Sequence, residues 1–168
     1  MQRRTTFSIV AVAATLLIGL TVVAIPTPDG SSEAASRAYL HGYNLPSSGV
    51  ALEGYCPVAY FAVDKAVRGV PEHASTHEGV SYWFVNAEAK DAFDASPEKF
   101  LPAYGGWCAF GMAVSDKFPV DPTRFKIEKG RLLLFLKNSG VDALELWNKG
   151  DRTELLRKAD AHWKKVRG

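Results

Sequence analysis

The sequence predicts an α+β domain in which a small antiparallel sheet with hairpins packs against three or four helices. An aromatic segment follows Glu78-Gly79, and two apolar segments flank Lys129-Gly130, which is typical of hairpin turns. Residues 152–166 place apolar side chains at helical spacing. The predicted order is strand, strand, helix, loop, hairpin, helix, helix, and this order favours the α+β class.

The first part of the domain is predicted to contain strands. Residues 58–63 form a short apolar and aromatic run, and residues 65–70 continue as a second extended piece. Residues 81–85 are aromatic and β-branched. We therefore expect a buried strand there, preceded by a hairpin turn at Glu78-Gly79.

A helix and a loop are predicted next. Asn86 is a suitable N-cap for a helix over residues 87–95, and Ser96-Pro97 starts another helical turn. Residues 104–114 are rich in glycine and aromatic side chains. They are predicted to form a loop or irregular strand, and we expect any chemistry of the domain to lie there.

The last part of the domain is predicted to be a hairpin followed by two helices. The hairpin strands are 124–128 and 131–136, around Lys129-Gly130. The predicted helices are 141–148 and 152–166. The sequence shows no internal repeat.

The N-terminal segment predicts export from a bacterial cytoplasm. Arg3 and Arg4 precede an uncharged apolar run over residues 7–25, which is the order of a secretory signal. That run is also long enough to anchor the chain in a bilayer. Either way we expect the domain in the periplasm or cell envelope. The predicted organisation is a signal peptide or membrane anchor over 1–30, a linker over 31–49 and the folded domain over 50–168.

Charge and motifs exclude several functions. The formal net charge is +2 and includes Arg3 and Arg4, so a domain without them is close to neutral. Nucleic-acid binding is therefore not expected, because it needs clustered and unopposed cations. The sequence contains no serine nucleophile elbow and no phosphate-binding loop. These observations favour a binding or structural protein over an enzyme.

Two segments with one cysteine each carry a family resemblance. Residues 51–61 read Ala-Leu-Glu-Gly-Tyr-Cys-Pro-Val-Ala-Tyr-Phe, and residues 104–111 read Tyr-Gly-Gly-Trp-Cys-Ala-Phe-Gly. Together with the aromatic segment 81–88, they resemble the exported branch of the YHS domain family. The resemblance runs from about residue 51 to the last predicted helix. Cys108 matches the family pattern, whereas Cys56 stands where an aspartate is more usual.

The resemblance implies a YHS-like domain with a role in metal handling. Metal binding is suspected for the family in general. Members associated with copper pumps use additional cysteines that this chain lacks, so the resemblance carries over only Cys108 and not a complete metal site.

The two cysteines leave three interpretations open. A disulfide between Cys56 and Cys108 suits an oxidising compartment. Alternatively, both thiolates with the Met112 thioether could bind Cu(I), with His73 or His77, predicted to lie in a polar loop, as a nitrogen ligand. Both cysteines could also be buried, reduced side chains.

Two functions follow from these alternatives. The first is an exported YHS-like binding domain that holds a metal ion, with copper favoured, or a small ligand near Cys56 and Cys108. The second is a disulfide-stabilised structural or interaction domain with no metal and no catalytic activity.

Overall fold

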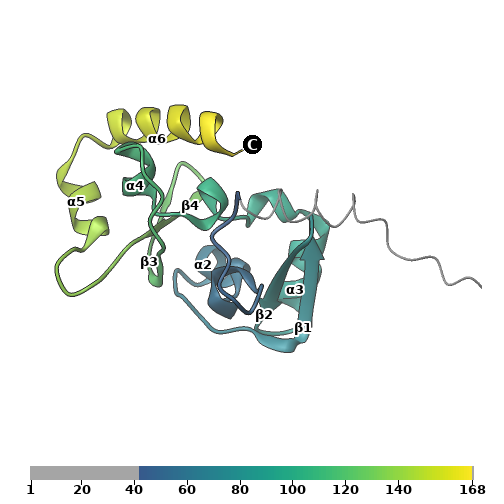
Figure 1. The fold of residues 1–168 in the computed structure, drawn as a ribbon. Coiled ribbons are helices and arrows are strands. Elements are labelled where there is room, and N and C mark those ends of the chain that lie inside the picture. Colours follow the sequence, from purple (N-terminus) through teal and green to yellow (C-terminus); the bar gives the residue numbers. More distant parts are fainter. Residues whose placement is uncertain (1–41, 168) are drawn as a thin grey trace, which may run out of the picture.

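The computed structural model describes residues 42–167, and this part of the chain is an α+β fold with two separate two-stranded antiparallel sheets and five helices (Figure 1). Short helical turns are labelled η. The elements, in chain order, are η1 (Ala51–Gly54), α2 (Pro57–Ala62), β1 (Val70–His77), β2 (Val80–Phe84), α3 (Ala87–Ala95), η2 (Pro97–Lys99), η3 (Ala103–Gly106), α4 (Ala109–Ala113), β3 (Asp121–Glu128), β4 (Arg131–Phe135), α5 (Ala143–Lys149) and α6 (Arg152–Val166).

The same structural motif occurs twice along the chain. Residues 51–101, the first half, and residues 103–166, the second half, each contain a tight turn, a short helix, a hairpin, a helix and a final helical element. The two tight turns have nearly the same backbone. Three consecutive residues in each have positive φ, with values of 56°, 52° and 82° at Leu52, Glu53 and Gly54, and of 57°, 59° and 84° at Tyr104, Gly105 and Gly106.

The two hairpins also match. In each, the strands are joined at a charged residue and a glycine with positive φ, Glu78-Gly79 in the first half and Lys129-Gly130 in the second. Each pairing is interrupted near its open end by a bulge of the same size. The registers are Val70↔Phe84 then Ala74↔Trp83 in one hairpin, and Asp121↔Phe135 then Phe125↔Leu134 in the other.

The expectation of no internal repeat is therefore wrong at the level of structure. The two halves share few residue identities, among them Cys56 with Cys108 and Gly54 with Gly106. Backbone geometry can be repeated with different side chains because turns and hairpins need particular φ values more than particular residues.

Each half has its own hydrophobic core, and β4 lies between the two. Leu132 and Leu134 pack into the core of the first half, whereas Leu133 and Phe135 pack into the core of the second. Because side chains alternate across a strand, a continuous apolar run can fill two cores at once. In Figure 1, α2, β1, β2 and α3 lie on one side of β4, and α4, α5 and α6 on the other.

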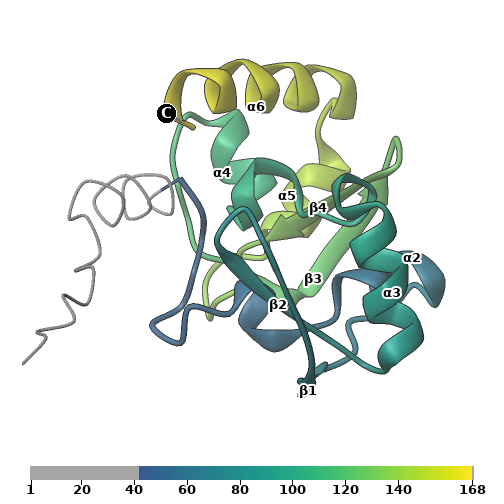
Figure 2. The same cartoon turned by 90° about the vertical axis from the view of Figure 1, so that its right-hand side faces the viewer.

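The halves differ most in their final element. In the first half this element is η2, which is three residues long and is followed by Pro102. In the second half it is α6, which is 15 residues long. Two views, Figures 1 and 2, show α6 running alongside α4 at one end of the molecule.

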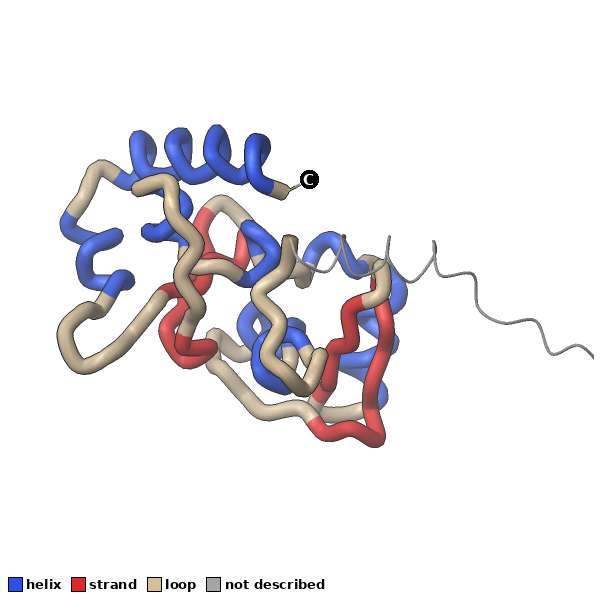
Figure 3. The backbone as a smooth tube through the Cα atoms, in the orientation of Figure 1, coloured by secondary structure: helices blue, strands red, loops and turns tan. Residues whose placement is uncertain are grey.

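Several predicted elements are confirmed. The structure contains the strand predicted at 81–85 and the helices predicted at 87–95 and 152–166, each to within one residue. Asn86 caps its helix through a hydrogen bond of 2.9 Å that its Oδ1 accepts from the Ala89 amide. Figure 3 shows a pair of strands at each predicted hairpin turn, although the first strand of the first pair was not predicted.

Four predictions of local structure are wrong. Residues 58–62 belong to helix α2, which begins at Pro57, a residue whose fixed φ suits the first turn of a helix. The extended piece predicted at 65–70 is not a strand, because β1 begins only at Val70. The segment over 104–114 folds as a turn and helix α4. The polar segment that contains His73 and His77 is strand β1, which pairs with β2 despite its polar composition.

Candidate ligand-binding cleft

The two cysteines occupy equivalent positions in the two halves and are not bridged. Cys56 precedes α2 and Cys108 precedes α4, and both side chains are fully buried. They belong to different cores. The Cys108 Sγ accepts hydrogen bonds from the backbone amides of Gly111 at 3.4 Å and Leu136 at 3.3 Å. The Cys108 side chain therefore connects the residue after β4 to the first turn of α4. The Cys56 side chain makes no equivalent hydrogen bond to its helix, α2.

The residues proposed as metal ligands are only partly brought together. Met112 shares the second core with Cys108, and its amide donates to the Cys108 carbonyl at 2.9 Å. His77 instead packs edge-on against Phe93 of the first half, with ring centroids 6.2 Å apart. Within residues 42–167, no three His, Cys, Asp or Glu side chains are grouped so that they could hold a metal ion. Copper binding stays a prediction.

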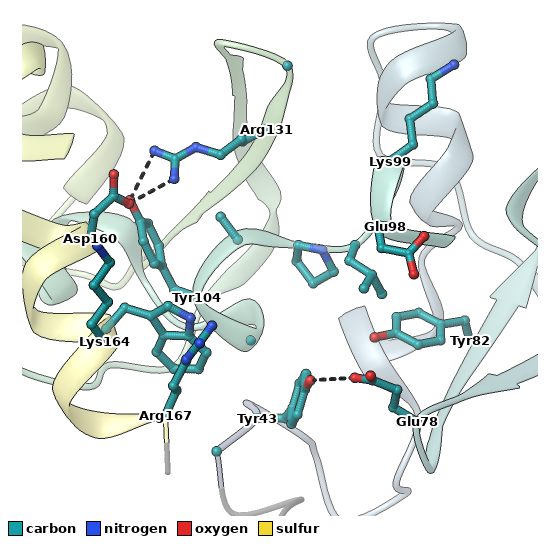
Figure 4. Close-up of a pocket in the computed structure, with 17 residues that line it drawn as sticks. Tyr43, Glu78, Tyr82, Glu98, Lys99, Tyr104, Arg131, Asp160, Lys164 and Arg167 are labelled. Carbon is teal, nitrogen blue, oxygen red and sulfur yellow. Dashed lines mark hydrogen bonds and ion pairs between the residues drawn. The ribbon is translucent and has the colours of Figure 1, made fainter. Parts of the chain in front are cut away.

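A cleft of about 770 Å³ lies away from both cysteines, and its lining comes from both halves (Figure 4). Its walls include the tip of the first hairpin, the turn η3, the start of β4 and the last turns of α6. Its lining residues are Gly42, Tyr43, Glu78, Tyr82, Glu98, Lys99, Leu101, Pro102, Ala103, Tyr104, Gly105, Gly130, Arg131, Asp160, Trp163, Lys164 and Arg167.

Helix α6 reaches the cleft because it continues well past its first turns. Asp151 starts the helix by accepting hydrogen bonds from the amides of Thr153 and Glu154. Leu156 and Ala159 then bury one face of α6 in the second core. In the next turns Trp163 still packs against that core and also lines the cleft, together with Asp160 and Lys164.

Gly105 lets three segments meet at the cleft. Its φ is +59°, and a Cβ at this position would stand 3.0 Å from the Gly42 carbonyl oxygen, 3.0 Å from the Trp163 ring and 3.3 Å from the Tyr43 Cα. Only glycine combines this backbone conformation with so close an approach at low cost.

A hydrogen-bonded network fixes one wall of the cleft. The Tyr104 hydroxyl donates to Asp160 Oδ1 at 2.9 Å, and Arg131 Nη1 donates to the same oxygen at 2.8 Å. Arg131 Nη2 lies 3.4 Å from the Tyr104 hydroxyl, and its guanidinium lies 5.6 Å from the centre of the Tyr104 ring. Figure 4 shows the three side chains converging from η3, β4 and α6.

The network keeps its protons at neutral pH. Burial, reinforced by the hydrogen bond to Asp160, raises the pKa of Tyr104 well above its usual range, so the hydroxyl stays protonated. Burial lowers the pKa of Arg131, but its hydrogen bond to Asp160 and the nearby Tyr104 raise it, with a net upward shift. Arg131 is therefore a permanent cation at the cleft.

The charges of the cleft are unevenly distributed. Lys164 and Arg167 stand on α6, on the same side as Arg131, whereas Glu78 and Glu98 stand on the opposite side (Figure 4). On the first-half side, the Tyr43 hydroxyl donates to Glu78 Oε2 at 3.5 Å. The α6 side of the cleft thus carries three cations and Asp160, whereas the opposite side carries two glutamates and Lys99.

Residues 42–46, which fall in the predicted linker, pack Tyr43 and Leu45 against the first core and form hydrogen bonds with the second half. The Asn44 amide donates to the Gly105 carbonyl at 2.8 Å, and the Asn44 side chain donates to the Gly106 carbonyl at 3.1 Å. Trp107 Nε1 donates to the Gly42 carbonyl at 2.9 Å. This segment separates the cleft from a smaller cavity of about 310 Å³.

Sequence reasoning missed the cleft. Arg131 lies in β4, whereas Asp160 and Trp163 lie in α6, and no motif joins these two segments. The one available signal was position: 104–114 was expected to carry the chemistry, and Tyr104 and Gly105 do line the cleft.

Comparisons with protein-family models, curated proteins and solved structures found no match to the chain. No helix within residues 42–167 is long and apolar enough to cross a membrane, and the apolar run over 7–25 lies outside the described residues. The YHS resemblance and the predicted export therefore stay predictions.

Proposed function

We propose that this protein is an exported, YHS-like binding domain that holds a small molecule in the cleft between η3, the hairpin tips and α6. The observation that carries the proposal is the cleft itself. Its volume of about 770 Å³ falls within the range of small-molecule sites, roughly 300–1,000 Å³. It also combines aromatic walls with a few fixed polar groups, as such sites do.

The rigidity of the cleft supports binding. The Arg131, Asp160 and Tyr104 side chains hold one another in place before any ligand arrives. A pre-organised wall loses little conformational freedom on binding, which favours affinity.

The composition of the lining favours binding over covalent catalysis. Among the lining residues that lie within 42–167 there is no serine, threonine, cysteine or histidine. The Tyr104 hydroxyl contacts Asp160 and Arg131. Burial raises its pKa, so it stays protonated at neutral pH and is a poor base or nucleophile.

The test is binding of two soluble aromatic probes, 2-naphthoate and 2-naphthamide, to the full chain by saturation-transfer NMR. We expect at least one of them to bind. Ala103→Trp, which fills the cleft, should abolish that binding, whereas Ala92→Trp on the exposed face of α3 should not. Absence of binding by both probes, or equal binding by both variants, would overturn the proposal.

Copper binding is a second candidate, favoured by one observation. Met112 lies one helical turn after Cys108, and both sulfur-bearing side chains are fully buried in the same core. A methionine and a cysteine are ligand types that suit Cu(I). Its test is the copper content of the purified chain before and after Met112→Leu, which would remove the thioether while keeping an apolar side chain.

A further inference from the structure

We infer that the ligand of this cleft is a small aromatic carboxylate whose charged group lies against Arg131, Lys164 and Arg167. The inference rests on the proposed function and assigns the chemical class of its ligand. It draws on three features: the free donors of Arg131, the charge balance of the α6 side, and the aromatic side chains nearby.

Arg131 is held in place by two hydrogen bonds and still has N–H donors available for a ligand. A guanidinium has five N–H donors, and the hydrogen bonds to Asp160 and Tyr104 engage two of its nitrogens through one donor each. The Arg131 side chain is 37% exposed and that of Asp160 is 43% exposed, so a ligand can reach the pair. The remaining donors form a planar fork whose geometry suits a carboxylate.

The charge balance of the α6 side favours an anion. Arg131, Lys164 and Arg167 contribute three positive charges to that side of the cleft, and Asp160 contributes one negative charge. The net positive charge attracts an anion. The planar fork of Arg131 makes a carboxylate the matching group.

The body of the ligand is expected to be flat and apolar. The Trp163 ring approaches the position of the missing Gly105 Cβ to 3.0 Å, and Tyr43 and Tyr104 also line the cleft. Pro102 and Ala103 extend this apolar surface along the cleft. Aromatic side chains of this kind pack well against rings.

The opposite side limits where the carboxylate can lie. Glu78 and Glu98 both line the cleft there, and the Lys99 ammonium lies over the Phe100 ring, 5.2 Å from its centre. Figure 4 shows Lys99 extending away from the two glutamates. A carboxylate at that side would lie close to Glu98, so the orientation with the carboxylate on the α6 side is favoured.

The experiment compares the dissociation constants of 2-naphthoate and 2-naphthamide for the full chain. The probes share a ring system and differ in one charge. We expect naphthoate to bind about tenfold more tightly at low salt, because charge-assisted hydrogen bonds are about twice as strong as neutral ones. We expect this preference to shrink as ionic strength rises.

Two neighbouring lysines on α6 supply the matched variants. Lys164 lines the cleft, and Lys165 next to it is exposed and outside the lining. Lys164→Gln should weaken naphthoate binding about threefold without changing naphthamide binding, because it removes one cation near the carboxylate. Lys165→Gln should change neither. Arg131→Lys keeps the charge but removes the fork, and should also weaken naphthoate selectively.

The outcomes separate the two proposals. Equal affinity for both probes, with binding still lost in Ala103→Trp, would overturn the carboxylate inference and leave small-molecule binding intact. A naphthoate preference unchanged by Lys164→Gln and Arg131→Lys would also overturn it. No binding of either probe would overturn both proposals.

Discussion

The two halves of the molecule build the same motif and use it differently. In the first half the motif ends after one turn, η2, followed by Pro102. In the second half the equivalent element continues as α6, and its last turns form a wall of the cleft. The extended final helix therefore adds to the second core and also supplies a wall of the candidate site that has no counterpart in the first half.

The second strands of the two hairpins differ in a related way. In β2 the side chains alternate between buried and partly exposed, so the strand serves one core. In β4 the four residues after Arg131 are all buried, and they serve both cores. The second half therefore completes the core of the first, and we expect the two halves to unfold together.

The largest effect is expected from removing the equivalent core rings Phe93 and Trp147. Phe93 packs on Phe84 with ring centroids 5.0 Å apart, and Trp147 packs on Phe135 at 5.6 Å. Phe93→Ala and Trp147→Ala should each cost about 3–5 kcal/mol. Because β4 joins the cores, urea denaturation of each variant should show a single transition by both fluorescence and circular dichroism.

Val114→Ala is the control for these two variants, because this side chain is 53% exposed. It should change the free energy of unfolding by less than about 0.5 kcal/mol. Two separate transitions in either core variant would show that the halves fold independently, against the argument from β4.

The next largest effect is expected in the tight turns, where substitutions at equivalent positions should have opposite signs. Gly105→Ala puts a Cβ 3.0 Å from the Gly42 carbonyl oxygen at a φ of +59°, and should destabilise the protein by about 1–3 kcal/mol. Glu53 is exposed and has a φ of 52°. Glu53→Gly relieves that strain and should stabilise the protein by up to about 1 kcal/mol.

Thermal unfolding of Gly105→Ala and Glu53→Gly measures both changes. Shifts of the melting temperature in the same direction would contradict the assignment of the two turns as equivalent in backbone but different in packing.

Helix caps provide a smaller contrast. Asn86 caps α3 through one hydrogen bond, so Asn86→Ala should cost about 1 kcal/mol. Asp142 caps α5 and also pairs with Arg124 and, at 2.8 Å, with Lys137, and its side chain is only 10% exposed. Asp142→Ala should cost about 2–3 kcal/mol, because it also leaves Arg124 unpaired.

Asp142→Asn separates the two roles of this side chain, because an asparagine can still cap the helix but carries no charge. Denaturant midpoints at low and high salt provide the measurement. A cost for Asp142→Ala no larger than that for Asn86→Ala would show that the ion pairs contribute nothing.

The smallest effect is expected at the cysteines. Cys108→Ala removes an acceptor shared by two backbone amides and should cost about 1–2 kcal/mol, whereas Cys56→Ala should cost about 1 kcal/mol or less. Thiol titration without reductant should find both thiols unreactive in the native protein and both reactive in denaturant. No reactive thiol in denaturant would instead support the disulfide alternative.

Local patterns were enough for the elements whose signals lie close together in sequence. Asn86 with the apolar face of α3, the glycines of the hairpin turns and the apolar stripe of α6 each depend on residues within a few positions. The strand prediction for 58–63 was wrong because a short apolar run is compatible with a buried helix as well as with a strand. Strand β1 was not predicted because its side chains are polar and partly exposed and show no strand pattern. It is a strand because it pairs with β2.

The sequence by itself determined the α+β class, the second hairpin, the turn of the first hairpin, the principal helices and the two cysteine-bearing segments, because these depend on local propensity and periodicity. Only the tertiary structure decided that the motif is repeated, that Cys56 and Cys108 belong to separate cores, and that a cleft forms. The cleft depends on bringing Tyr43, Tyr104, Arg131 and Asp160 together. Residues so far apart in the chain leave no periodic signal, because their proximity is set by how β4 and α6 pack on the two cores.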